Sequence, residues 1–226
     1  MKYLCENIQG CVLGYTQSDE ITLVLVDYKT FSTDAWFGYN VQKCTSIAAS
    51  MATMEFNRRF EKHVSAFIYG WEHLYGEEEM ENRKEYEAAL LAAVKKGAMF
   101  DARIFNITKE EVTNCVYWRQ LDASRNSVQM VGQANFSHNE LQNKNCSQIQ
   151  DMLMLQKGIN WNNLPTYQKR ESCCIKEEYV SEMKPGQTKD EIFEMTTRSR
   201  WVIDKDIPIF KGDGRKYIDS LVYVGE

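Results

Sequence analysis

The stretch GYTQSDEITLVL, residues Gly14–Leu25, sets two adjacent carboxylates, Asp19 and Glu20, between two apolar segments. CVLGY precedes the polar TQSDE, and the β-branched run ITLVLV follows it, so residues 11–26 predict two strands joined by a tight connection. Carboxylates that both lie on the second strand point to opposite faces of the sheet. The pair is therefore either a solvated hairpin turn or a rigid source of oxygen ligands at a strand end.

Downstream of this hairpin the sequence predicts helices and one further strand. Apolar residues recur at the 4-3-4-3 spacing of a buried helical stripe at Phe37, Val41, Cys44, Ala48 and Met51, which leaves Lys43 on the exposed side. A charged helix follows, acidic over residues 76–87 and ending at Gly97, which is the charge order that the helix dipole favours. FDARIFNI, residues 100–107, predicts a strand, and a long helix runs from Thr108 to about Gln133.

This order of elements predicts an α+β fold. Strand, strand, helix, charged helix, strand and helix make up most of a βαββαβ core of the polymerase-palm or ferredoxin-like type, with its first strand missing. MKYLCENIQ is then the tail of the first helix, with Leu4 and Ile8 one turn apart. We expect a single domain over residues 1–226: a palm core at about 1–135, a helical insertion at about 71–97, and a helical extension with short strands at about 136–226.

Composition narrows the class of protein. A chain of 226 residues can bury a substantial core, and its apolar runs are too short to span a bilayer. Met1 is not followed by a secretory leader, so we expect a cytoplasmic protein. The seven cysteines show no paired spacing, which argues against a zinc site and a disulfide framework. The net charge of −5 argues mildly against nucleic acid, although QKRESCCIK and TTRSRW are locally basic.

Three groups of residues could carry chemistry on phosphates. Asp19 can serve as a hard oxygen ligand for Mg²⁺, which takes carboxylates together with substrate phosphates and water. Arg103 and Lys43 could grip a triphosphate, but each taken singly is also explained as a surface charge. Arg119, Asp122 and Asn126 recur at helical spacing, either as an internal hydrogen-bonded network or as a substrate face. No HExxH pattern or Gly-x-Ser-x-Gly elbow is present.

Taken together, these segments resemble one family. YTQSDEITLVL, MFDARIF, YWRQLDASRNS, the helix ending in KGINWNNLP, and QKRESCCIKEE resemble, in this order, the motif blocks of the tRNA-His guanylyltransferases, the 3′–5′ RNA polymerases. The resemblance covers nearly the whole chain from about Ile8, and YWRQLD with SDE at this separation is specific. SIAAS, DASRNSVQM and FSHNELQNK resemble the bacterial and archaeal guanylyltransferase-like branch.

The resemblance implies an activity and its substrates. A 5′-monophosphorylated tRNA is activated by ATP or GTP, and the 3′-hydroxyl of an incoming nucleotide then attacks the activated 5′ phosphate. The resemblance implies two Mg²⁺ ions bridged by Asp19, with Glu20 supporting this catalytic site. It also implies tRNA and nucleoside triphosphates as partners, a homo-oligomer that is a tetramer (a dimer of dimers), and no membrane.

The family's motifs also assign roles to further residues of this chain. The residues expected to contact nucleotides are Ser18, Lys43, Arg103 and Asn126. Those expected on the adjoining active-site or tRNA surface are Arg119, Asp122, Lys169 and Arg170.

Two departures from the family's pattern shape the expected function. The family's opening motif, which holds the second metal carboxylate, is missing, so we expect that ligand before residue 1. Eukaryotic members carry a His where Ser124 stands and a Lys near Ile149, and their absence favours repair of 5′-truncated tRNA over guanylylation of tRNA-His alone. Two alternatives stay open: a palm-type nucleotide cyclase, and a catalytically inactive tRNA-binding protein.

Overall fold

The structure, a computed structural model, describes residues 1–74, 80–182 and 195–224. The chain forms two compact units. The first comprises Met1–Ala35 with Asn106–Glu226, and the second is Trp36–Phe105. Each unit is described by itself below.

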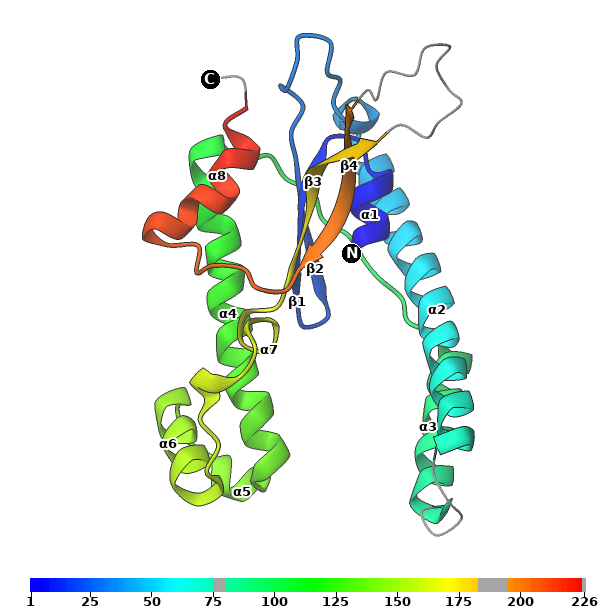
Figure 1. Cartoon of the computed structure of the whole chain (residues 1–226), viewed down its shortest axis with the longest axis vertical. Helices are drawn as coiled ribbons and strands as arrows, with labels where there is room; N and C mark the ends of the chain where they lie inside the picture. The colour runs from blue at the N-terminus through cyan, green and yellow to red at the C-terminus, as the bar shows by residue number, and fades with distance from the viewer. Residues whose placement is uncertain (75–79, 183–194, 225–226) are drawn as a thin grey trace. The chain divides into compact units, whose positions relative to one another are not determined.

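The first unit is built on a four-stranded sheet, which is antiparallel throughout and has the order β2-β1-β3-β4 (Figure 1). Its strands are β1 (Cys11–Gln17), β2 (Glu20–Leu25), β3 (Cys173–Glu182) and β4 (Met195–Asp204). The hairpin predicted over residues 11–26 is confirmed, because Gln17 pairs with Glu20 across a two-residue turn. The strand β3 lies against β1 only from Cys173 to Ile175, so most of the β3–β4 ribbon extends beyond β1.

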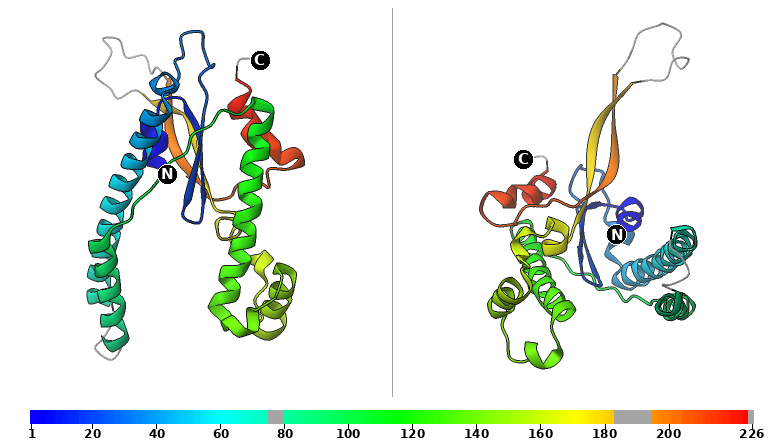
Figure 2. Two further views of the ribbon diagram at one scale, coloured as in Figure 1. Left: turned by 180° about the vertical axis from the view of Figure 1, so that it is seen from behind. Right: turned by 60° about the horizontal axis from the view of Figure 1, so that its bottom comes forward.

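Successive side chains of β1 point to opposite faces of this sheet. Leu13, Tyr15 and Gln17 lie on one face and are all buried. Two helices, α4 (Lys109–Asn135) and α8 (Lys216–Val222), pack on this face, where their apolar side chains join Leu13 and Tyr15 in the main core. The short helix α1 (Lys2–Asn7) packs on the other side of the sheet, as Figure 2 shows. Leu4 and Ile8 are buried there, and the helix predicted in this segment is confirmed, whereas its place as the tail of a longer palm helix stays a prediction.

The C-terminal half of α4 carries a second, smaller core. Val128 packs there with Ile149 and Leu153 of α6 (Cys146–Lys157) and with Phe136. The remaining short elements of this unit are α5 (His138–Leu141), η3 (Trp161–Asn163), α7 (Thr166–Arg170) and η4 (Gly212–Arg215). The segment that leads from α7 into β3 lies against β1, where Tyr15 bonds the Arg170 carbonyl and Thr16 bonds the Ser172 carbonyl.

The expectation of a helical C-terminal extension is wrong in one respect. Residues 136–226 supply two ten-residue strands, β3 and β4, which form half of the sheet. Glu177, Glu178, Arg198 and Arg200 lie in the part of this ribbon that pairs with no other strand, so both of its faces meet solvent. A strand exposed on both faces lacks the apolar alternation by which a strand is recognised in a sequence.

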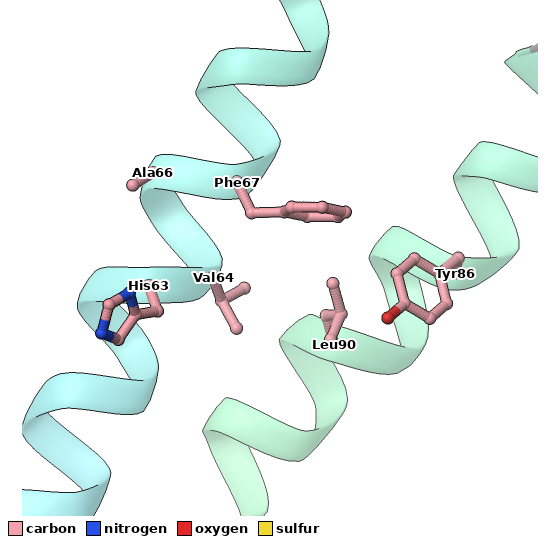
Figure 3. A pocket seen from close by; sticks show the side chains of 6 residues that line it. All are labelled: His63, Val64, Ala66, Phe67, Tyr86 and Leu90. Atoms are coloured by element: carbon pink, nitrogen blue, oxygen red, sulfur yellow. The ribbon is translucent and has the colours of Figure 1, made fainter. Parts of the chain in front are cut away.

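The second unit is a helical hairpin. It begins with η1 (Trp36–Tyr39) and continues into α2 (Val41–Leu74) and α3 (Met80–Lys96). Gly97 follows α3 with a φ of +68°, so the predicted end of the charged helix is confirmed. Figure 3 shows Val64 and Phe67 of α2 and Leu90 and Tyr86 of α3 lining an apolar hollow of about 480 Å³. The Phe67 and Tyr86 rings meet edge to face at 6.1 Å.

Two predictions for this unit are wrong. FDARIFNI forms no strand. Where the chain enters this segment it is held by side chains of α2 instead: the Asn57 side chain bonds both N–H and C=O of Ala98, and Thr53 Oγ1 accepts the N–H of Phe100. The apolar stripe does not begin at Phe37, whose φ of +51° keeps it out of the helix, and Val41 is 58% exposed. Cys44 is buried as expected, and Lys43 is exposed.

Candidate active site

The turn between β1 and β2 presents Asp19 to solvent. Ser18 has a left-handed backbone with a φ of +53°, whereas two-residue hairpins favour Gly, Asn or Asp at such positions. Among the described residues, the Asp19 carboxylate has no hydrogen-bond or ion-pair partner. The turn therefore holds an accessible carboxylate on a short, well-defined support.

Helix α4 fixes this turn from one side. The Gln17 side-chain amide donates to Asp122 Oδ2, and Arg119 Nη1 lies 3.0 Å from Glu20 Oε2. Arg125 Nη2 donates to the other oxygen of Asp122 at 2.9 Å. The polar stripe of α4 is thus partly an internal network, since Asp122 serves the hairpin, and partly an exposed face.

The segment entering β3 fixes the turn from another direction. The Tyr15 hydroxyl donates to the carbonyl oxygen of Arg170 at 2.8 Å, and burial raises the pKa of Tyr15, which keeps this donor protonated. The Thr16 N–H donates to the carbonyl of Ser172 at 3.1 Å. The Ser18 N–H points at Glu171 Oε1, 3.4 Å away. Burial raises the pKa of Glu171, while this hydrogen bond acts in the opposite direction.

The other predicted residues of the first unit lie around α4 and α7. Asn126 is exposed on α4, further along the helix from Arg119. Lys169 Nζ donates to the carbonyl of Asn162 at 2.6 Å and lies 6.0 Å from the centre of the Trp161 ring. The Nε of Arg170 is buried with no hydrogen-bond partner in the described part of the chain.

Two predicted nucleotide contacts belong to the second unit. Lys43 is exposed in the first turn of α2, and its Nζ lies 4.4 Å from the centre of the Phe37 ring. The Asn40 side chain caps this helix by accepting the Lys43 N–H at 3.0 Å. Arg103 is highly exposed and contacts Asp101 at 3.3 Å. Both cations are accessible, as contact with a triphosphate requires.

The described residues do not complete a two-metal centre. No group of three or more His, Cys, Asp or Glu side chains that could hold a metal ion forms within residues 1–74, 80–182 and 195–224. Asp19 fits as one ligand of an Mg²⁺ that also takes phosphate oxygens and water. Glu20 is less suited, because one of its carboxylate oxygens, Oε2, is paired with Arg119.

Three residues that complete this geometry escape prediction from the sequence: Gln17, Arg125 and Glu171. Gln17 has a detectable signal, because in the alternation of the strand it continues the inward row of Leu13 and Tyr15; the structure confirms that this polar side chain is only 4% exposed. Arg125 lies three residues after Asp122, a spacing at which helical side chains meet. Glu171 has no signal, since its contact joins segments 153 residues apart.

The arrangement suits chemistry on phosphates. A carboxylate on a braced turn can position a cation or a nucleophile, and nearby arginines can neutralise phosphate charge. No helix in the described part of the chain combines the length and apolar character of a bilayer span.

Comparison with known proteins adds independent findings. Residues 1–108 match the family model for tRNAHis guanylyltransferase (Thg1). A bacterial tRNA(His) guanylyltransferase-like protein in complex with ATP is 38% identical, with a TM-score of 0.74 over 99% of this chain and 76% of that one. A bacterial protein of the same description in complex with GTP is 35% identical, with a TM-score of 0.67 over 99% of this chain and 74% of the other.

A curated relative is also similar. An uncharacterized protein of Acanthamoeba polyphaga mimivirus is 30% identical in an alignment of 171 residues that covers 71% of this chain. The chain spans 53% of the length of that relative.

Proposed function

The chain belongs to the tRNA-His guanylyltransferase family, and we propose that it is a nucleotidyltransferase that extends the 5′ end of tRNA in the 3′–5′ direction, directed by a template. The observation that carries this proposal is the match to an ATP-bound bacterial guanylyltransferase-like protein over 99% of the chain. A GTP-bound protein of the same description supports both triphosphates as substrates. The reaction serves repair of truncated tRNA or guanylylation of tRNA-His.

The proposed reaction has two phosphoryl-transfer steps. The 5′-monophosphate of tRNA attacks the α-phosphorus of ATP or GTP, and pyrophosphate leaves. The 3′-hydroxyl of the incoming nucleotide then attacks the 5′ phosphorus of the tRNA, and AMP or GMP leaves. Such steps depend mainly on positioning and on neutralising charge, which carboxylates, lysines and arginines of this chain can supply.

We assign the residues as follows. Asp19 and Glu20 are catalytic, with Arg119 orienting Glu20 through their 3.0 Å ion pair. The residues proposed to contact nucleotides are Ser18, Lys43, Arg103 and Asn126, and those proposed to face tRNA or the active site are Arg119, Asp122, Lys169 and Arg170. The accessible positions of Asp19, Lys43 and Arg103 support these roles.

Asp19 is also the ligand that this chain would supply to Mg²⁺. The bound ion would neutralise phosphate charge. A palm-type core within a single catalytic domain, and a homotetramer built as a dimer of dimers, remain predictions for the same protein.

The proposal is tested with a 5′-monophosphorylated tRNA that lacks its first nucleotide. Wild type, Asp19→Ala and Asp151→Ala are compared for incorporation of a labelled nucleotide; Asp151 is an exposed carboxylate on α6 and serves as the matched control. Asp19→Ala should reduce the rate at least about 100-fold, the scale of losing one group that stabilises charge in the transition state. Asp151→Ala should retain the rate.

Binding of the same tRNA, measured in parallel, separates this proposal from a non-enzymatic role. Equal binding by wild type and Asp19→Ala, with no incorporation by either, would identify a tRNA-binding protein without this activity. Incorporation by Asp19→Ala at the wild-type rate would contradict the role of Asp19.

A further inference from the structure

Two residues with left-handed backbones meet beside the proposed active site. Ser18 has a φ of +53°, and Glu171 has a φ of +66° with a ψ of −152°. They are 153 positions apart in the sequence, and the Ser18 N–H points at Glu171 Oε1 across 3.4 Å. Neither is a glycine, although positive φ values favour glycine.

Glu171 holds the more demanding of the two conformations. Its φ and ψ fall in a region that is essentially restricted to glycine, and such residues persist only where the surroundings hold them. The neighbours on both sides are tied to β1: the Arg170 carbonyl accepts from Tyr15, and Ser172 bonds Thr16 through backbone and side chain. A glycine would satisfy this backbone without strain, but it would provide no carboxylate.

We propose that Glu171 is a positioning residue, whose carboxylate holds the Ser18 N–H and thereby fixes the direction in which the turn presents Asp19. The inference rests on the function proposed above for Asp19. The turn has a serine at a position of positive φ, so its own sequence defines its geometry weakly. Gln17 and Thr16 fix the strand below the turn, whereas Glu171 is bonded to the turn itself.

Glu171→Gly separates positioning from stability. The substitution relieves backbone strain, so its melting temperature should equal or exceed that of wild type. Its kcat for nucleotide addition should nevertheless fall roughly 10- to 100-fold with KM for the nucleotide little changed, because small displacements of a reacting group are costly. Glu171→Gln keeps an acceptor oxygen and should recover most of the lost rate.

Asn143→Gly is the matched control. Asn143 also has a positive φ, of +61°, in the loop between α5 and α6. Replacing it with glycine changes another residue of positive φ without touching the hairpin. This variant should keep the wild-type kcat.

Amide hydrogen exchange tests the inference without any activity assay. Residues 18–20 should exchange faster in Glu171→Gly than in wild type, with Glu171→Gln between the two, while α4 is unchanged. A wild type that adds no nucleotide would refute the proposed function, and the exchange measurement would still decide the role of Glu171. The positioning role would be overturned if residues 18–20 of Glu171→Gly exchanged at the wild-type rate. It would also be overturned if wild type is active and Glu171→Gly keeps its kcat.

Discussion

Gln17 links the turn that carries Asp19 to helix α4. Its amide nitrogen donates to Asp122, whereas its amide oxygen is buried with no partner in the described part of the chain. A buried polar group without a partner costs about 1–3 kcal/mol, so this position is only half satisfied. Asp122 therefore supports the hairpin structurally, in addition to the surface role proposed for it.

Two substitutions of Asp122 should separate these roles. Asp122→Ala removes the acceptor of Gln17 and should lower the free energy of unfolding by about 1–3 kcal/mol. Asp122→Asn should cost no more than about 1 kcal/mol. The Gln17 side-chain amide can flip so that its oxygen accepts a hydrogen bond from the new Asn side-chain amide, and its N–H then replaces its oxygen as the buried group without a partner. Urea denaturation measures both; equal losses in the two variants would contradict this account.

Individual residues of the site differ in how far the sequence reveals them. Asp19 stands out because two apolar segments frame it, and Arg119 and Asp122 stand out through their helical spacing. Glu171 could not be identified, because backbone angles and a contact across 153 positions leave no mark on local sequence. Of the alternatives left open for the α4 stripe, the internal network is formed by Asp122, which bonds Gln17, whereas a substrate face that includes the exposed Asn126 stays a prediction.

Helix α4 is the element that joins the two cores of the first unit. Its N-terminal half packs Val112 and Val116 against the sheet, and its C-terminal half packs Val128 against α6. Gly132 allows the close approach to α6, because a Cβ there would lie 2.8 Å from Ile149 Cγ2. Ile149 is fully buried, so its branched methyl group has little freedom to move.

Gly132→Ala should therefore destabilise the protein although alanine is the better helix former. Overpacking typically costs about 1–3 kcal/mol and the gain in helix propensity offsets up to about 1 kcal/mol, which predicts a net loss of roughly 1–2 kcal/mol. Gly70→Ala is the matched control, because nothing lies within 4 Å of a Cβ at that position of α2. It should gain about 0.5–1 kcal/mol. Thermal unfolding followed by circular dichroism distinguishes the two, and a stabilised Gly132→Ala would refute the tight contact.

Elements with a buried face were predictable from the sequence, and elements defined by distant partners were not. The β1–β2 hairpin and α4 show clear periodicity and appear as expected. The FDARIFNI segment has the composition of a strand but forms none, and the distant side chains Asn57 and Thr53 of α2 bond the backbone of Ala98 and Phe100 where the segment begins. The β3–β4 ribbon is the reverse case. Its backbone pairing is regular, but because both faces of most of the ribbon meet solvent, its sequence lacks the apolar alternation that predicts a strand.

At the scale of the whole molecule, similarity to known proteins extends along nearly the entire chain. The bacterial guanylyltransferase-like proteins align over 99% of it, including the β3–β4 region that periodicity failed to reveal. The net charge of −5 does not favour RNA binding overall, so under the proposed function contacts with tRNA should come from local groups such as Lys169 and Arg170. The proposed function for the molecule is extension of RNA at the 5′ end, directed by a template.

The direct test uses 5′-truncated tRNAs that differ only in the nucleotide opposite the missing residue, each offered the four nucleoside triphosphates separately. We predict that the nucleotide added is the one complementary to the opposing base, and that the label lies at the 5′ end of the product. Addition of the same nucleotide to every tRNA, or labelling at the 3′ end, would contradict templated 3′–5′ extension.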